Sequence, residues 1–139
     1  MNITFSFIII DDSELDCFVT QKFLERSNKS LTINTFQDAE DALKIIRESR
    51  NKKSKRPTIV LLDLLMPGMS GFKFVEEFEK FPAEIQKMYR IIILTVLSSN
   101  SHPIDIHRVL NNGTVHSVIE KPLTKEKLIS LLDDIEPGQ

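Results

Sequence analysis

A chain of 139 residues is long enough to bury one core but short for two, so we expect a single domain over residues 1–139. Hydrophobic residues make up 41% and charged residues 27%, a balance typical of soluble globular proteins rather than disordered or membrane-embedded ones. The formal net charge of -2 provides no basic surplus for a phosphate backbone, which disfavours direct nucleic-acid binding.

The cysteine content and the N-terminal segment indicate a cytoplasmic protein. Cys17 is the only cysteine, so an intramolecular disulfide and a thiolate metal cluster are both excluded. The apolar run Phe5–Ile10 lacks a preceding cationic segment and is followed at once by Asp11, unlike a secretory signal. No run approaches the roughly 20 apolar residues that cross a bilayer. We therefore expect no membrane insertion.

The first half of the chain alternates strand and helix patterns. The unbroken apolar run Phe7–Ile10 predicts a strand buried on both faces. A helix is predicted next, with an apolar stripe made of Leu15, Phe18, Val19 and Phe23. The mixed pattern of Leu31–Phe36 indicates a strand at a sheet edge. A second helix is predicted from the spacing of Ala39, Ala42, Leu43 and Ile46.

The second half repeats this alternation after a basic loop, residues 51–57, which we interpret as a solvated connection or as a contact for an acidic partner. Buried strands are predicted at Ile59–Leu62, Ile91–Leu94 and Val115–Ile119. Helical spacing recurs over residues 74–81, 106–110 and 128–135. N-caps are expected at Ser13, Asp38 and Thr124.

Five strand–helix repeats in this order predict an α/β fold with a doubly wound parallel sheet, right-handed crossovers and helices on both faces. We expect the flavodoxin-like strand order 2-1-3-4-5. In such sheets a ligand binds beyond the carboxyl ends of the strands, where the strand order reverses. The functional residues should therefore lie at the strand ends.

Polar residues stand at four of these ends. Asp11 and Asp12 follow the first strand and Asp63 ends the third, so the flavodoxin-like order brings the three carboxylates together. Clustered carboxylates repel each other, and a hard divalent cation with oxygen ligands, such as Mg²⁺, compensates them. Thr95 ends the fourth strand and provides a hydroxyl. Lys121 ends the fifth and adds a fixed positive charge.

This set of groups favours phosphoryl transfer over proton abstraction. No histidine stands at these strand ends to act as a general base. Phosphoryl transfer needs mainly positioning and charge stabilisation, and an aspartate carboxylate can attack phosphorus to give an acyl phosphate. Asp63 is therefore the candidate nucleophile, with Lys121 and Thr95 as neighbours.

The whole pattern resembles the receiver domain of two-component response regulators, of the stand-alone, chemotaxis-regulator-like kind, over essentially the full length of the chain. The resemblance rests on the acidic pair, residues 11–12, and on the segment 62–71, which reads LDLLMPGMSG. Thr95 after an Ile-rich strand and the Lys121-Pro122 pair complete it. All four elements occur in order and at predicted strand ends, which makes the match specific.

The resemblance implies that Asp63 accepts a phosphoryl group from a sensor histidine kinase or a histidine phosphotransfer protein. It implies a Mg²⁺ or Mn²⁺ ion held by Asp12, Asp63 and the backbone carbonyl of Leu65, with Asp11 acting mainly through water. Lys121 and Thr95 are implied to contact the phosphoryl oxygens, and the Lys121-Pro122 peptide bond to be cis. Because the chain stops after the last predicted helix, we expect output by contact with a downstream protein.

Four positions depart from the common receiver pattern or qualify it. Val118 stands where many receivers carry the Phe or Tyr of an aromatic switch, so switching would depend on movement of the loop after strand four and its helix. Val96 replaces a residue that is often small. Leu65 and Leu97, two residues beyond Asp63 and Thr95, are apolar, and we hypothesise that they shield the acyl phosphate from water.

Two other functions fit part of the pattern. A receiver-like domain that only docks would not need Asp12, Asp63, Thr95 and Lys121 together. A phosphohydrolase of the haloacid dehalogenase type would need a second Asp at position 65, which is Leu65. A histidine metal site is disfavoured because His102 and His107 are five residues apart and do not share a helical face. Cys17 is interpreted as a packing residue.

Overall fold

The computed structural model describes residues 4–27, 29–49, 56–64, 66, 68–95 and 113–136. Its centre is one five-stranded sheet in the order β2-β1-β3-β4-β5, with every neighbouring pair parallel. The strands are β1 (Phe5–Ile10), β2 (Ser30–Phe36), β3 (Thr58–Asp63), β4 (Tyr89–Thr95) and β5 (Val115–Glu120). The predicted flavodoxin-like order is confirmed.

The three central strands are buried on both faces, as their continuous apolar runs predict. Successive side chains of a strand point to opposite faces. Ile8, Val60 and Ile91 therefore join one core cluster, while Ile9, Leu61 and Ile92 join the other. The prediction was wrong for β5, where His116 is exposed and most neighbours are only partly buried, because β5 forms the second edge of the sheet.

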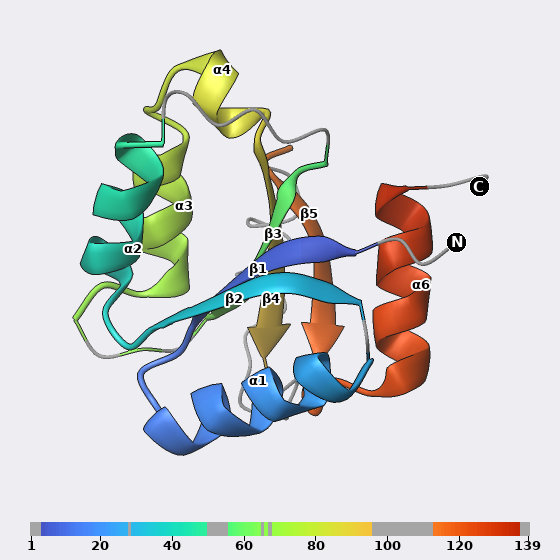
Figure 1. Ribbon diagram of the computed structural model, residues 1–139. Coiled ribbons are helices and arrows are strands. Elements are labelled where there is room, and N and C mark those ends of the chain that lie inside the picture. Colours follow the sequence, from blue (N-terminus) through green and yellow to red (C-terminus); the bar gives the residue numbers. More distant parts are fainter. Residues whose placement is uncertain are drawn as a thin grey trace.

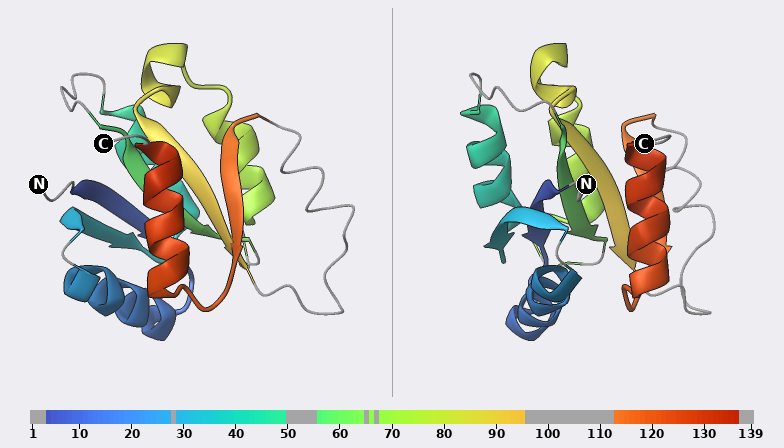
Figure 2. Two further views of the ribbon diagram at one scale, coloured as in Figure 1. Left: turned by 90° about the vertical axis from the view of Figure 1, so that its right-hand side faces the viewer. Right: turned by 45° about the vertical axis from the view of Figure 1, so that its right-hand side comes forward.

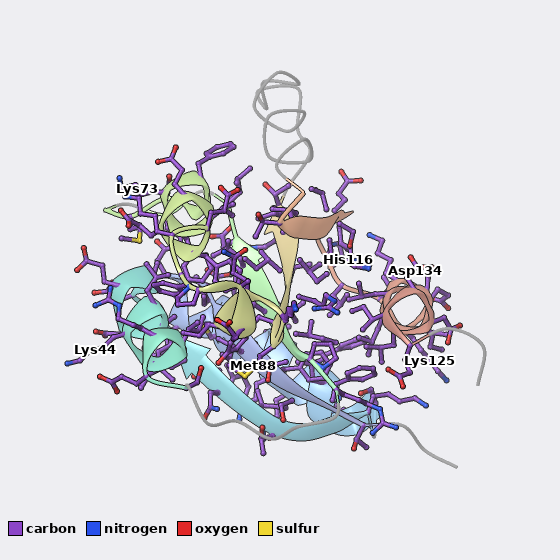
Figure 3. The ribbon with its side chains drawn as sticks, turned by 90° about the horizontal axis from the view of Figure 1, so that it is seen from above. Lys44, Lys73, Met88, His116, Lys125 and Asp134 are labelled. Atoms are coloured by element: carbon purple, nitrogen blue, oxygen red, sulfur yellow. The ribbon has the colours of Figure 1, made fainter. Side chains whose placement is uncertain are left out.

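Helices cover both faces of the sheet, as Figures 1 and 2 show. The first cluster packs beneath α2 (Ala39–Arg47), α3 (Gly71–Phe78) and the short α4 (Ala83–Gln86). The second packs beneath α1 (Glu14–Ser27) and α6 (Lys125–Ile135). Seen from above in Figure 3, Lys44 and Lys73 project outward from α2 and α3, while Asp134 lies on α6 at the opposite side of the sheet.

The predicted N-caps are confirmed. The side chain of Asp38 accepts a hydrogen bond from the Glu40 N–H at 2.9 Å, and that of Thr124 accepts one from Lys127 at 3.2 Å. Ser13 caps α1 in the same way, because its hydroxyl accepts the Asp16 N–H at 3.2 Å. A side-chain oxygen at this position satisfies an N–H group that has no partner within the helix.

The helix predicted over residues 74–81 ends earlier than expected. Helix α3 stops at Phe78, and a separate turn of helix, α4, begins after Pro82. Proline disfavours a helical conformation at the residue before it, which explains why the segment divides here. The predicted helix over 106–110 lies outside the described residues.

The apolar stripe predicted for α1 was wrong for three of its four residues; only Phe23 is partly buried, against the second core cluster. Leu15 is 69% exposed, and Phe18 and Val19 are each 56% exposed. The side of the helix that faces the sheet carries Cys17 and Leu24 instead, which are buried. The sulfur of Cys17 donates to the backbone carbonyl of Asp11 at 3.2 Å, and burial raises the pKa of its thiol to about 11. The interpretation of Cys17 as a packing residue is confirmed.

None of the helices in the described segments is both long enough and apolar enough to cross a membrane.

Candidate functional site

Three carboxylates meet at the carboxyl edge of the sheet. Strands β1 and β3 are neighbours, with Ile10 beside Leu62 in the register. Asp11 follows β1 directly and Asp63 is the last residue of β3, so both side chains emerge at the same edge. One oxygen from each of Asp11, Asp12 and Asp63 lies within 4.8 Å of the other two. The convergence expected from the strand order is therefore present.

The three carboxylates differ in their surroundings. The side chain of Asp11 is buried, and both of its oxygens are occupied by protein donors. Oδ1 accepts the Ser13 N–H at 3.0 Å, and Oδ2 accepts the ammonium of Lys121 at 3.1 Å. Asp63 is nearly buried, with 12% of its side chain exposed, whereas Asp12 is open to solvent. The pocket thus has a buried inner side and an open outer side.

Among the described residues, Lys121 brings the positive charge to this pocket. Its backbone N–H donates to the Thr95 carbonyl at 2.8 Å, which ties the end of β5 to the end of β4. Its ammonium lies 3.1 Å from Asp11 Oδ2 and 3.5 Å from Asp63 Oδ1. Burial lowers the pKa of Lys121, but the carboxylates of Asp63 and Asp11 outweigh that effect and hold the pKa above its usual value. The lysine is therefore charged at neutral pH.

Thr95 completes the edge. It is the last residue of β4, it is buried, and it follows Leu94, the register partner of Asp63. The Lys121-Pro122 peptide bond is cis, as the resemblance implied.

The family assignment comes from a match of residues 7–133 to the profile of the response regulator receiver domain. The chain belongs to the response regulator receiver domain family. Its strand order and its acidic pocket agree with that assignment. Receiver domains are the phosphoacceptors of two-component signalling, and this is the role of the family.

Two solved structures and one curated protein illustrate the match. A response regulator receiver protein from Dyadobacter fermentans is 29% identical, with a TM-score of 0.81 over 97% of this chain and 100% of that one. The receiver domain of the sensor histidine kinase PA1611 from Pseudomonas aeruginosa is 16% identical, with a TM-score of 0.72 over 97% and 99%. The peroxide stress-activated histidine kinase mak1 of Schizosaccharomyces pombe is 26% identical over 94% of this chain.

Many of the relatives are much longer than this receiver domain. The chain spans 8% of the length of mak1, and between 28% and 81% of the length of three other curated relatives. The similarity therefore concerns the receiver domain and not the further parts of those proteins.

A glycine lets α3 approach the end of β3. The Gly71 N–H donates to the Leu64 carbonyl at 3.0 Å. A Cβ atom at Gly71 would lie 2.9 Å from the Asp63 carbonyl oxygen and 2.9 Å from Leu64 Cα, which is closer than real contacts allow. Glycine at position 71 thus keeps the backbone around Asp63 in place.

One residue of the pocket was missed from the sequence. The carboxylate of Asp16, on α1, lies 3.7 Å from the Lys121 ammonium. Asp16 is three residues after Ser13, the expected N-cap, which places it in the first turn of a helix that starts next to the acidic pair, and this was the available signal. The spacing alone does not show that a lysine 105 positions later in the chain reaches the same place.

Several residues singled out in the sequence lie outside the described residues. They are Leu65, Pro67, Val96, Leu97, His102, His107 and most of the basic loop. Val118 is described: it lies on β5 beside Ile93 and is partly buried against the first core cluster. His116 is exposed on the same strand.

Proposed function

We propose that Asp63 is the phosphoacceptor of this receiver domain and that the donor is the phosphohistidine of a sensor histidine kinase or a histidine phosphotransfer protein. In this reaction the P–N bond of the phosphohistidine breaks and a P–O bond forms to a carboxylate oxygen of Asp63, giving an acyl phosphate. The observation that carries the proposal is the convergence of three carboxylates with the Lys121 ammonium 3.5 Å from Asp63.

The carboxylates fit a divalent cation, Mg²⁺ or Mn²⁺. Hard cations of this kind take oxygen ligands, and the pocket provides three carboxylates within 4.8 Å of one another. The cleft of the PA1611 receiver domain holds a magnesium ion. When bound, the ion supplies charge neutralisation for the transferred phosphoryl group.

The different surroundings of the carboxylates support different roles. Asp12 is exposed, so its carboxylate is available as a direct ligand on the side of the pocket where Asp63 lies. The Leu65 carbonyl is the further protein ligand that the resemblance implies. Asp11 already accepts hydrogen bonds on both oxygens, which favours an indirect role through water.

Lys121 and Thr95 are proposed to hold the phosphoryl oxygens. The ammonium of Lys121 already lies beside Asp63, and Thr95 ends the neighbouring strand. A hydrogen bond from Thr95 to the phosphoryl group would draw in the loop that follows β4 and alter the surface that a downstream protein contacts. A cytoplasmic location and regulation by protein contact belong to the same proposal.

The test is intact-mass measurement after incubation with acetyl phosphate and Mg²⁺. We expect one phosphoryl adduct on the unmodified chain and none on Asp63→Asn. The exposed Asp133 of α6 gives a matched control, because Asp133→Asn removes the same charge and should keep the adduct. Chelation of the metal with EDTA should abolish labelling.

An adduct that survives in Asp63→Asn would assign the acceptor to another residue. Absence of any adduct, under conditions in which another receiver domain is labelled, would favour a domain that only docks.

A further inference from the structure

We propose that Asp16 competes with the phosphoryl group for the Lys121 ammonium and thereby limits phosphorylation of Asp63. The inference rests on the proposed function of Asp63 and assigns a positioning role to a residue outside the acidic triad, Asp11, Asp12 and Asp63. The lysine that is proposed to hold the phosphoryl oxygens has a third carboxylate partner, from α1, in addition to Asp11 and Asp63.

The position of Asp16 is fixed by the start of α1. The Ser13 hydroxyl accepts the backbone N–H of Asp16 at 3.2 Å, and the Ser13 N–H donates to Asp11 Oδ1 at 3.0 Å. Ser13 thus links Asp16 to the inner carboxylate of the pocket. The cap therefore holds the backbone of Asp16 at the start of α1, beside the pocket, while its half-exposed side chain reaches Lys121.

The two sides of Lys121 are unlike each other. On the inner side, Asp11 and Asp63 are 8% and 12% exposed in their side chains. On the outer side, Asp16 is 52% exposed and lies at 3.7 Å, the longest of the three contacts. Lys121 and Asp16 line one groove of about 380 Å³ with Val19 and Pro122, which leaves the lysine space on the Asp16 side.

This arrangement has an electrostatic consequence. A phosphoryl group on Asp63 brings negative charge to the inner side and needs the ammonium there. The Asp16 carboxylate attracts the same ammonium outward and repels the phosphoryl group. Removal of the Asp16 charge should therefore stabilise the phosphorylated state, whereas damage to α1 or to the pocket would destabilise it.

The experiment compares Asp16→Asn, Asp16→Glu and Glu14→Gln with the unmodified chain, using acetyl phosphate, Mg²⁺ and intact mass. Glu14→Gln is the matched control, because Glu14 is exposed in the same first turn and, among the described residues, forms no ion pair with Lys121. Both the steady-state phosphorylated fraction and the decay after donor removal are measured.

We expect Asp16→Asn to raise the ratio of phosphorylated to unphosphorylated chain about twofold to fivefold and to slow decay, the range of a half-exposed ion pair. Asp16→Glu, which keeps the charge, should stay closer to the unmodified chain, and Glu14→Gln should match it. An unchanged or reduced ratio in Asp16→Asn would overturn the inference. An equal rise in Glu14→Gln would also overturn it, because the charge would then act without contact to the lysine.

Failure of the proposed function gives a different result. In that case the unmodified chain takes no adduct, or Asp63→Asn keeps one, whatever residue stands at position 16.

Discussion

Helices α2 and α1 cover opposite faces of one sheet but bury different shares of their apolar side chains. In α2, Ala42, Leu43 and Ile46 are all buried. In α1, Cys17 and Leu24 are buried, while Leu15, Phe18 and Val19 form an exposed apolar strip. The apolar residues of α2 therefore belong mainly to the core, and those of α1 mainly to the surface.

The two helices also differ in how they are connected to the acidic pocket. Helix α1 begins three residues after Asp11 and is tied to it by Ser13 and by the sulfur of Cys17. Helix α2 begins at its own cap, Asp38, and its place is set by packing on β1, β3 and α3. The α2 side thus depends chiefly on hydrophobic packing, and α1 is also positioned through polar contacts to the proposed phosphorylation site.

The largest effect is expected from truncation of a fully buried side chain, such as that of Ile46 in α2. Ile46 is 0% exposed, so Ile46→Ala should lower the free energy of unfolding by about 2–5 kcal/mol through lost burial and a cavity. The neighbouring Ile45 is 48% exposed, and Ile45→Ala should cost less than about 1 kcal/mol. Urea unfolding of both variants measures the difference. Equal costs would contradict the assignment of the buried face.

A smaller effect is expected at the start of α2. The Asp38 side chain accepts the Glu40 N–H, so Asp38→Ala should lower the free energy of unfolding by about 0.5–2 kcal/mol. Asp38→Asn keeps an acceptor oxygen and should retain most of that stability. If both substitutions cost the same, the hydrogen bond is not the source of the effect, and the charge near the helix N-terminus is the better explanation.

The titration of Tyr89, the one tyrosine of the sequence, tests the packing of the core cluster beneath α2. Burial raises the pKa of Tyr89 above its usual value of 10.0, although the hydrogen bond to Ser49 partly opposes the shift. The folded chain then holds a proton that the unfolded chain loses. The contribution of Tyr89 to stability is complete below pH 10 and is lost as the pH rises through the native pKa.

Near-ultraviolet absorbance of the phenolate measures this directly. We expect the native chain to titrate at higher pH than the same chain in urea. A native midpoint at or below that of the unfolded chain would contradict the burial of Tyr89 beside Ser49.

The sequence was sufficient for the parts of the fold and site that follow from strand patterns. Uninterrupted runs such as Phe7–Ile10 identify buried parallel strands, and their order brings Asp11, Asp12 and Asp63 to one edge without further information. The resemblance added the cis bond before Pro122. The strand patterns and the resemblance both succeeded at residues whose surroundings are determined by the order of the strands.

The sequence-based prediction failed where helical spacing alone does not decide which face of a helix is buried. In α1, Leu15, Phe18 and Val19 have helical spacing, but so do Cys17 and Leu24, and only the second set faces the sheet. Hydrophobicity favours the wrong set, because the small side chain of a cysteine contributes less to an apolar pattern than three larger apolar side chains do. The contact of Asp16 was not predicted either, because its partner Lys121 is distant in the sequence and helical spacing does not report such contacts.

The smallest effect is expected on the exposed strip of α1. Leu15 is 69% exposed and Leu24 is 0% exposed, so the same substitution at two positions of one helix should change the free energy of unfolding by very different amounts. Leu15→Ala should change the free energy of unfolding by no more than about 0.5 kcal/mol, because little surface leaves contact and alanine favours a helix. Leu24→Ala should cost about 2–5 kcal/mol. If urea unfolding shows a large loss for Leu15→Ala, the side chain packs against the rest of the chain, and the apolar strip belongs to the core after all.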